Sequence, residues 1–132
     1  IKTNITFIIV NELNALIVNI SRKLDIIIPT LNEKENLKKL IPFLNENTCI
    51  DTKLYVVDSV HSVDDTYEIC QHYDVRYLKS NYARRSIQMN EGAAAGNGDI
   101  LLFLHADVLP PISFQKHIMQ HSIKKIIIKI FL

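Results

Sequence analysis

Short apolar runs alternate with amphipathic stretches along most of this chain. Mostly apolar runs of four or five residues are typical of strands that are buried on both faces of a sheet. The runs are residues 24–28, 54–57, 75–78 and 100–104. In the stretches between them, buried-type positions recur every three or four residues, and this spacing predicts helices. The stretches are residues 37–44, 66–73 and 85–95.

The strand and helix signals alternate, as they do in a parallel sheet with helical crossovers. We therefore predict an α/β fold class, with an open, mostly parallel sheet and flanking helices. The predicted sheet unit covers residues 24–111, preceded by an N-terminal extension (1–23) and followed by a basic, apolar segment (112–132) that begins with a helix after Ser113. Asn32 is predicted to cap the first helix, with Glu35 completing a capping box.

Polar residues follow three of the apolar runs. Asp58 comes directly after the second run, Asp107 lies shortly after the fourth, and Thr30, Asn32 and Glu33 follow the first. In open parallel sheets, ligands bind beyond the carboxyl ends of the strands. The pattern therefore predicts one ligand-binding crevice along this edge, although residues of these types also form turns and helix caps.

Composition indicates a soluble globular domain rather than a nucleic-acid-binding protein. Hydrophobic residues make up 48% and charged residues 22% of the chain, and the formal net charge is +1. Cys49 and Cys70 lie far apart, so we expect buried, reduced thiols rather than a disulfide or a metal site. Residues 1–20 contain too many polar side chains for a membrane-spanning helix and lack a signal-peptide cleavage site.

The two ends of the chain are unusual. It opens at Ile1 rather than Met, so we expect a fragment of a longer protein. No acidic residue follows Asp107, and the segment 123–132 is basic and apolar. This segment is expected either to contact an anionic membrane surface or to pack as a strand or helix against the rest of a larger domain. We expect the protein to be cytoplasmic, with a location at the cytoplasmic face of a membrane as the alternative.

Several motifs resemble those of the family 2 glycosyltransferases with the GT-A fold. The matching segments are residues 25–37 (DIIIPTLNEKENL), 56–58 (VVD), 62–66 (SVDDT), 88–95 (QMNEGAAA), 98–100 (GDI) and 104–107 (LHAD). The last three of these resemble a bacterial subgroup with an LHAD metal motif, and the resemblance covers about residues 24–111. It implies transfer of a sugar from a nucleotide-diphosphate donor to an acceptor hydroxyl, with inversion at the anomeric carbon.

The resemblance also implies a divalent cation, Mg²⁺ or Mn²⁺, because a cation can neutralise charge on the departing diphosphate. Asp107 resembles the last acid of the family's Asp-x-Asp motif and is the predicted metal ligand. His105 replaces the first acid, either as a second ligand or as a structural, hydrogen-bonding histidine.

The nucleotide-sugar site implied by the resemblance includes more of the polar residues named above. Asp58 resembles the acid that contacts the nucleoside, and Thr30, Asn32 and Glu33 resemble the loop that borders it. Arg85 begins a predicted helix, where the helix dipole and the guanidinium both favour phosphate, although it could equally be a solvated base.

No catalytic residue is predicted, because the family's acidic general base is expected in a C-terminal half beyond this chain. Glycines that usually follow the second strand are replaced here by Ser59, Val60 and His61. The alternative hypothesis is therefore a truncated, non-catalytic remnant that binds nucleotide weakly, or an interaction module that self-associates through an unfinished sheet edge. A nucleotidyltransferase is disfavoured, because residues 28–33 form no glycine-rich basic loop.

Overall fold

The computed structural model describes residues 22–48, 51–121 and 127–129. The predicted strands and helices are confirmed in the predicted order. The strands are β1 (Lys23–Thr30), β2 (Asp51–Ser59), β3 (Arg76–Ser80), β4 (Ile100–Phe103) and β5 (Ile127–Lys129). The helices are α2 (Lys34–Glu46), α3 (Thr66–His72), α4 (Arg85–Ala95) and α5 (Phe114–His121).

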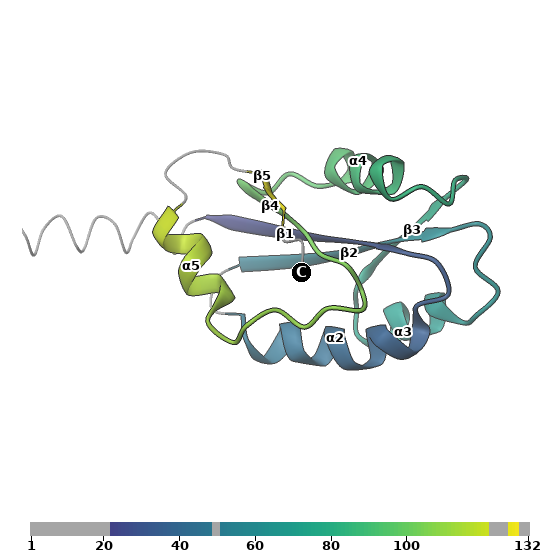
Figure 1. Cartoon of the computed structure of the whole chain (residues 1–132), viewed down its shortest axis with the longest axis horizontal. Helices are drawn as coiled ribbons and strands as arrows, with labels where there is room; N and C mark the ends of the chain where they lie inside the picture. Colours follow the sequence, from purple (N-terminus) through teal and green to yellow (C-terminus); the bar gives the residue numbers. More distant parts are fainter. Residues whose placement is uncertain (1–21, 49–50, 122–126, 130–132) are drawn as a thin grey trace, which may run out of the picture.

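The strands form one five-stranded sheet in the order β3-β2-β1-β4-β5 (Figure 1). All four strand pairs are parallel, as predicted. In the register of the sheet, Thr30 at the end of β1 pairs with Asp58 near the end of β2, and Asp58 pairs in turn with Lys79 of β3. The carboxyl ends of the three strands therefore lie together at one edge.

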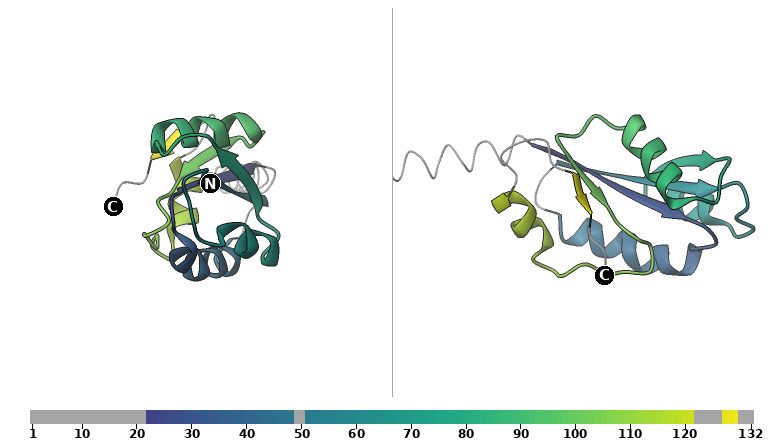
Figure 2. Two further views of the ribbon diagram at one scale, coloured as in Figure 1. Left: turned by 90° about the vertical axis from the view of Figure 1, so that its right-hand side faces the viewer. Right: turned by 45° about the horizontal axis from the view of Figure 1, so that its top comes forward.

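Helices cover both faces of this sheet. Helix α4 lies on one face, and α2, α3 and α5 lie on the other (Figures 1 and 2). Ile26 and Ile28 pack in the core on the face of the sheet that α2 covers. Ile27 between them packs on the other face, with Met89 and Ala93 of α4. Burial on both faces explains why the run in β1 is apolar without alternation.

Helix α4 approaches the sheet closely because it carries a glycine where it crosses β1 and β2. A Cβ atom at Gly92 would overlap the Ile27 side chain and lie 3.0 Å from Cγ2 of Val57. Only glycine avoids this overlap, so Gly92 sets the spacing between α4 and the sheet.

The capping prediction for Asn32 is wrong. Helix α2 has Glu33 at its N-cap position, with no capping bond from that side chain. Asn32 instead adopts a positive φ of 55°, which asparagine tolerates better than most residues. The first-turn N–H of Lys34 is satisfied from another loop, because it donates to Oδ2 of Asp64 at 2.9 Å. Glu35 accepts from Lys38 rather than completing a capping box.

Cys70 is a free, buried thiol, as predicted, whereas Cys49 lies outside the described residues. Of the predicted extension at residues 1–23, residues 1–21 also lie outside them, and Lys23 already belongs to β1. The segment 123–132 was predicted to pack as a strand or helix, and within it β5 forms a strand that pairs with β4. The rest of segment 123–132 falls outside the description, so its membrane contact stays a prediction. Within the described residues, no helix combines the length and the apolar character that crossing a membrane requires.

Candidate functional site

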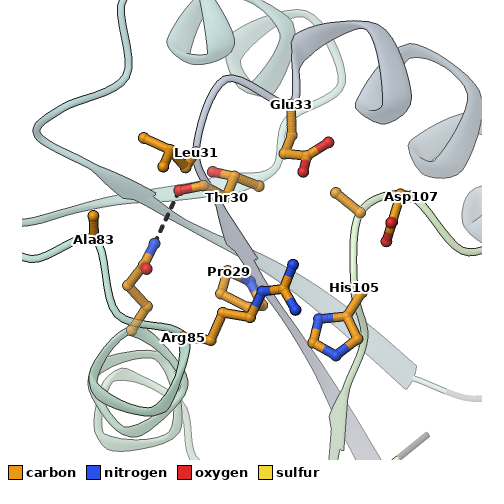
Figure 3. A pocket seen from close by; sticks show the side chains of 10 residues that line it. Pro29, Thr30, Leu31, Glu33, Ala83, Arg85, His105 and Asp107 are labelled. Atoms are coloured by element: carbon orange, nitrogen blue, oxygen red, sulfur yellow. Dashed lines mark hydrogen bonds between the residues drawn. The ribbon is translucent and has the colours of Figure 1, made fainter. Parts of the chain in front are cut away.

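A pocket of about 210 Å³ lies at the carboxyl edge of the sheet. It is formed by the end of β1 and the loop after it, by Ala83 and the first turn of α4, and by the segment after β4. Its lining residues are Pro29, Thr30, Leu31, Glu33, Ala83, Arg85, Gln88, His105, Ala106 and Asp107 (Figure 3).

The pocket brings together four of the six predicted site residues. Thr30, Glu33, Arg85 and Asp107 all line it, and so does His105. Arg85 extends from the start of α4 into the pocket, and the carboxylates of Glu33 and Asp107 lie on the side away from α4 (Figure 3). The pocket therefore combines one guanidinium with two carboxylates.

Asp58 does not line the pocket but lies beside it as a buried carboxylate. Its Oδ1 accepts from Thr30 Oγ1 at 2.8 Å and from Ser62 Oγ at 2.6 Å. Its Oδ2 accepts from the hydroxyl of Tyr77 at 2.9 Å. Burial, followed by the hydrogen bond to this carboxylate, raises the pKa of the Tyr77 phenol. Asp58 thus ties together β1, β3 and the loop after β2, and its contact with a nucleoside stays a prediction.

Asn32 also lies outside the pocket, where it joins two loops. Its N–H donates to Ser62 Oγ at 3.0 Å, and its Oδ1 accepts from the N–H of Val63 at 2.8 Å. These bonds hold the loop after β1 against the loop after β2. The contact predicted between Asn32 and the nucleoside remains untested.

Gln88 is a lining residue that the sequence analysis did not identify as part of the site. Its side chain is buried, and its Nε2 donates to the carbonyl oxygens of Thr30 at 2.9 Å and Val57 at 2.8 Å. A signal for it exists in the sequence, since Gln88 precedes Gly92 by one helical turn on the face that packs against the sheet.

The Arg85 side of the pocket is electropositive. Arg85 is exposed in the first turn of α4, Arg84 precedes it, and this turn contains no acidic residue. In the part of the chain that the structure describes, neither arginine forms a salt bridge. The positive end of the helix dipole and the two guanidinium groups favour an anion here.

The opposite side offers oxygen ligands for a cation. Asp107 is exposed, and Glu33 and His105 are partly exposed. Among the described residues, no group of three or more His, Cys, Asp or Glu side chains could hold a metal ion alone. One or two carboxylates nevertheless fit Mg²⁺ or Mn²⁺ when phosphate oxygens and water complete the coordination. The assignment of Asp107 as metal ligand stays a prediction.

Solved structures of the GT-A type are similar to this chain in fold. TarS residues 1–349 from S. aureus matches with a TM-score of 0.66 and 20% identity over 74% of this chain and 31% of that one. Glucosyl-3-phosphoglycerate synthase from Mycobacterium tuberculosis, in complex with UDP, matches with a TM-score of 0.58 and 24% identity over 71% of this chain and 37% of that one. The chain thus spans about a third of each. No curated protein matches this sequence.

The family assignment comes from the sequence itself. The model of the family described as "Glycosyl transferase family 2" matches residues 25–125. The match includes β1 and the pocket-lining residues that follow it, α4, and the segment with His105 and Asp107. Because it extends over far more than half of the sequence and agrees with the GT-A fold, the chain belongs to glycosyl transferase family 2.

Proposed function

We propose that this chain forms the donor-binding part of a glycosyltransferase, which moves a sugar from a nucleotide-diphosphate donor to an acceptor hydroxyl with the help of a divalent cation. The observation that supports this most directly is the pocket, where Arg85 lies opposite Glu33 and Asp107 at the carboxyl edge of the sheet. Positive charge stabilises a diphosphate, and Arg85 supplies it on one side of the pocket only, since the other side carries two carboxylates.

The diphosphate would therefore lie between Arg85 and a cation held by Asp107. Arg85 and the first-turn N–H groups of α4 would bind and orient its oxygens. A bound Mg²⁺ or Mn²⁺ would supply charge neutralisation for the departing nucleoside diphosphate. His105 would either add a ligand or hydrogen-bond near the diphosphate, and these two roles differ in how its replacement changes metal affinity.

The nucleoside would extend from the pocket along the loop after β1. A volume of about 210 Å³ is below the roughly 300–1,000 Å³ of sites that enclose a whole drug-sized ligand. It fits the diphosphate and leaves the nucleoside to contact Thr30, Asn32 and Glu33, with Asp58 behind them. The M. tuberculosis synthase has been crystallised with Mn²⁺, UDP-glucose and phosphoglyceric acid, so a UDP-sugar is the first donor to test.

We assign neither a general base nor an acceptor, since the chain spans only about a third of the structures that it resembles. The alternative function is a remnant that binds nucleotide weakly and has no turnover. The bonds of Asp58 favour weak binding, because three hydroxyl donors already occupy the carboxylate that would otherwise contact the nucleoside.

The test is calorimetric titration with UDP and GDP, each with and without Mn²⁺. We expect one of them to bind in a metal-dependent manner, Asp107→Ala to abolish the metal dependence, and Arg85→Gln to weaken binding. Matched controls are Asp51→Ala and Arg76→Gln, because both residues are exposed and lie at the opposite edge of the sheet. Failure of a folded chain to bind either nucleotide would refute the proposal, and equal effects of Asp107→Ala and Asp51→Ala would remove Asp107 from the site.

A further inference from the structure

The buried face of α4 contains a polar group that the proposed binding of the donor does not use. Gln88 and Gly92 are the buried residues of this helix. Gln88 is only 2% exposed, yet its carboxamide reaches two backbone carbonyls that belong to different strands. These carbonyls, of Thr30 and Val57, lie near the carboxyl ends of β1 and β2.

A primary carboxamide suits this position because it has two N–H donors on one nitrogen. The Nε2–O distances of 2.9 Å and 2.8 Å use both donors. Methionine has a similar shape but no donor, and an ionised glutamate would face both carbonyls with negative charge. Buried carbonyls are almost always paired, and either replacement removes the donor that Gln88 supplies to both carbonyls, which is unfavourable for folding.

Gln88 and Gly92 fix different aspects of the placement of α4. Gly92 permits close contact with the sheet, but apolar contact does not by itself prevent the helix from sliding or turning. The two hydrogen bonds of Gln88 are directional and set the position of the first turn relative to the strand ends. Arg85 precedes Gln88 by three residues, so both side chains lie on neighbouring positions of one helix face, and both line the pocket.

We propose that Gln88 is a positioning residue: by hydrogen bonding to the ends of β1 and β2, it holds Arg85 where the pocket receives the diphosphate. The role of Arg85 in this statement rests on the proposed function. Gln88 itself acts through Arg85, and one of its two anchoring bonds is to the carbonyl of Thr30, a residue that lines the same pocket.

The first experiment measures the dissociation constants of UMP and UDP by calorimetry for the wild-type chain, Gln88→Met, Arg85→Gln and the double variant. We expect Gln88→Met to weaken UDP binding by about tenfold, which corresponds to about 1.4 kcal/mol, and UMP binding by much less. The double variant should bind UDP no more weakly than Arg85→Gln alone. A purely structural role would weaken UMP and UDP equally and would add to the effect of Arg85→Gln, and that result overturns the proposal.

The matched control is Gln71→Met. Gln71 lies on α3, is exposed, and donates from Nε2 to the hydroxyl of Tyr67 at 2.6 Å. Its replacement removes a glutamine side-chain hydrogen bond away from the pocket, so the UMP and UDP affinities should not change. An equal loss of UDP affinity in both variants would contradict a specific role for Gln88.

A second readout needs no nucleotide, and its first part needs no variant. In the wild-type chain, NMR should show slow hydrogen exchange for both side-chain amide protons of Gln88 and fast exchange for those of Gln71. Where Gln88→Met folds, ¹⁵N relaxation of Arg85 Nε should show increased motion. Absence of nucleotide binding would refute the proposed function only, whereas equally fast exchange at Gln88 and Gln71, or unchanged motion of Arg85, would overturn the positioning role.

Discussion

Replacement of Asp58 should lower the free energy of unfolding in a graded way, because three hydroxyl groups converge on its buried carboxylate. The O···O distances are 2.8 Å to Thr30, 2.6 Å to Ser62 and 2.9 Å to Tyr77. Hydrogen bonds to a charged group contribute about 1.5–3 kcal/mol each, compared with about 0.5–1.5 kcal/mol for neutral ones. The size of the effect therefore depends on how many bonds remain and whether they are charged.

In Asp58→Asn, the amide oxygen can replace Oδ1 and keep the bonds from Thr30 and Ser62, while the NH₂ group donates to a rotated Tyr77 hydroxyl. Each bond loses its charge, about 1 kcal/mol, but a neutral amide is easier to bury. We expect a net loss of about 1–2 kcal/mol. Asp58→Ala removes all three bonds and leaves the buried Thr30 hydroxyl without this acceptor, so we expect a loss of about 3–5 kcal/mol.

The assay is urea denaturation followed by circular dichroism, with the m-value compared between variants. Asp51→Asn is the matched control, because Asp51 begins the same strand but is exposed, and its effect should stay within about 0.5 kcal/mol. Tyr77→Phe should destabilise the wild-type chain more than it destabilises Asp58→Asn. If Asp58→Ala costs no more than the Asp51 control, the three-hydroxyl network does not contribute to folding and the reasoning fails.

Three further predictions concern other parts of the fold. Gly92→Ala should destabilise the chain by about 1–3 kcal/mol in thermal melts, because the added Cβ overlaps Ile27, although alanine normally favours a helix. No loss of stability would contradict the close approach of α4 to the sheet. Asp64→Ala should cost about 0.5–2 kcal/mol in urea, because α2 loses the acceptor for its Lys34 N–H; an unchanged midpoint would contradict this. Burial, with a smaller contribution from Asp58, raises the pKa of the Cys70 thiol from 9.0 to about 12. Stability should therefore fall by about 1.4 kcal/mol per pH unit between pH 9 and about 12, where the thiol is ionised in the unfolded chain but not in the folded one. Urea titrations at several pH values should show a shallower decline in Cys70→Ala, and equal slopes would refute the assignment.

The sheet could be predicted from the sequence because burial on both faces leaves a direct signal. The run at residues 100–104 has no polar position, and β4 is buried throughout. Helix α4 was predicted at its observed bounds, since Arg85 follows a polar stretch and Gly96 ends the helix. The face of α4 that packs on the sheet was less evident, because its buried residues are a glutamine and a glycine rather than large apolar side chains.

The site could be predicted in part, and the difference lies in the range of the interactions. Parallel strands place their carboxyl ends together, so the meeting of Thr30, Glu33 and Asp107 at one pocket follows from topology alone. The partners of Asn32 and Gln88 could not be predicted in this way, because they lie between 30 and 58 residues away in the sequence and only the folded structure brings them near. A local capping motif was therefore predicted for Asn32 where a long-range contact formed.

The position of an acidic residue relative to the end of its strand explains which carboxylates face the pocket. Asp25 and Asp58 lie within β1 and β2, where neighbouring strands and helices exclude water, so internal donors must satisfy them. Asp25 accepts from the N–H of Gly98 at 2.7 Å, just as Asp58 accepts from hydroxyl groups. Glu33 and Asp107 come three and four residues after the last residues of β1 and β4, in loops that leave them partly or fully exposed. Asp25→Asn should therefore lower stability in urea without changing nucleotide affinity. Asp107→Asn, in contrast, should lower metal-dependent nucleotide affinity without changing stability. The reverse pattern would show that position relative to the strand end does not separate structural from ligand-binding acids.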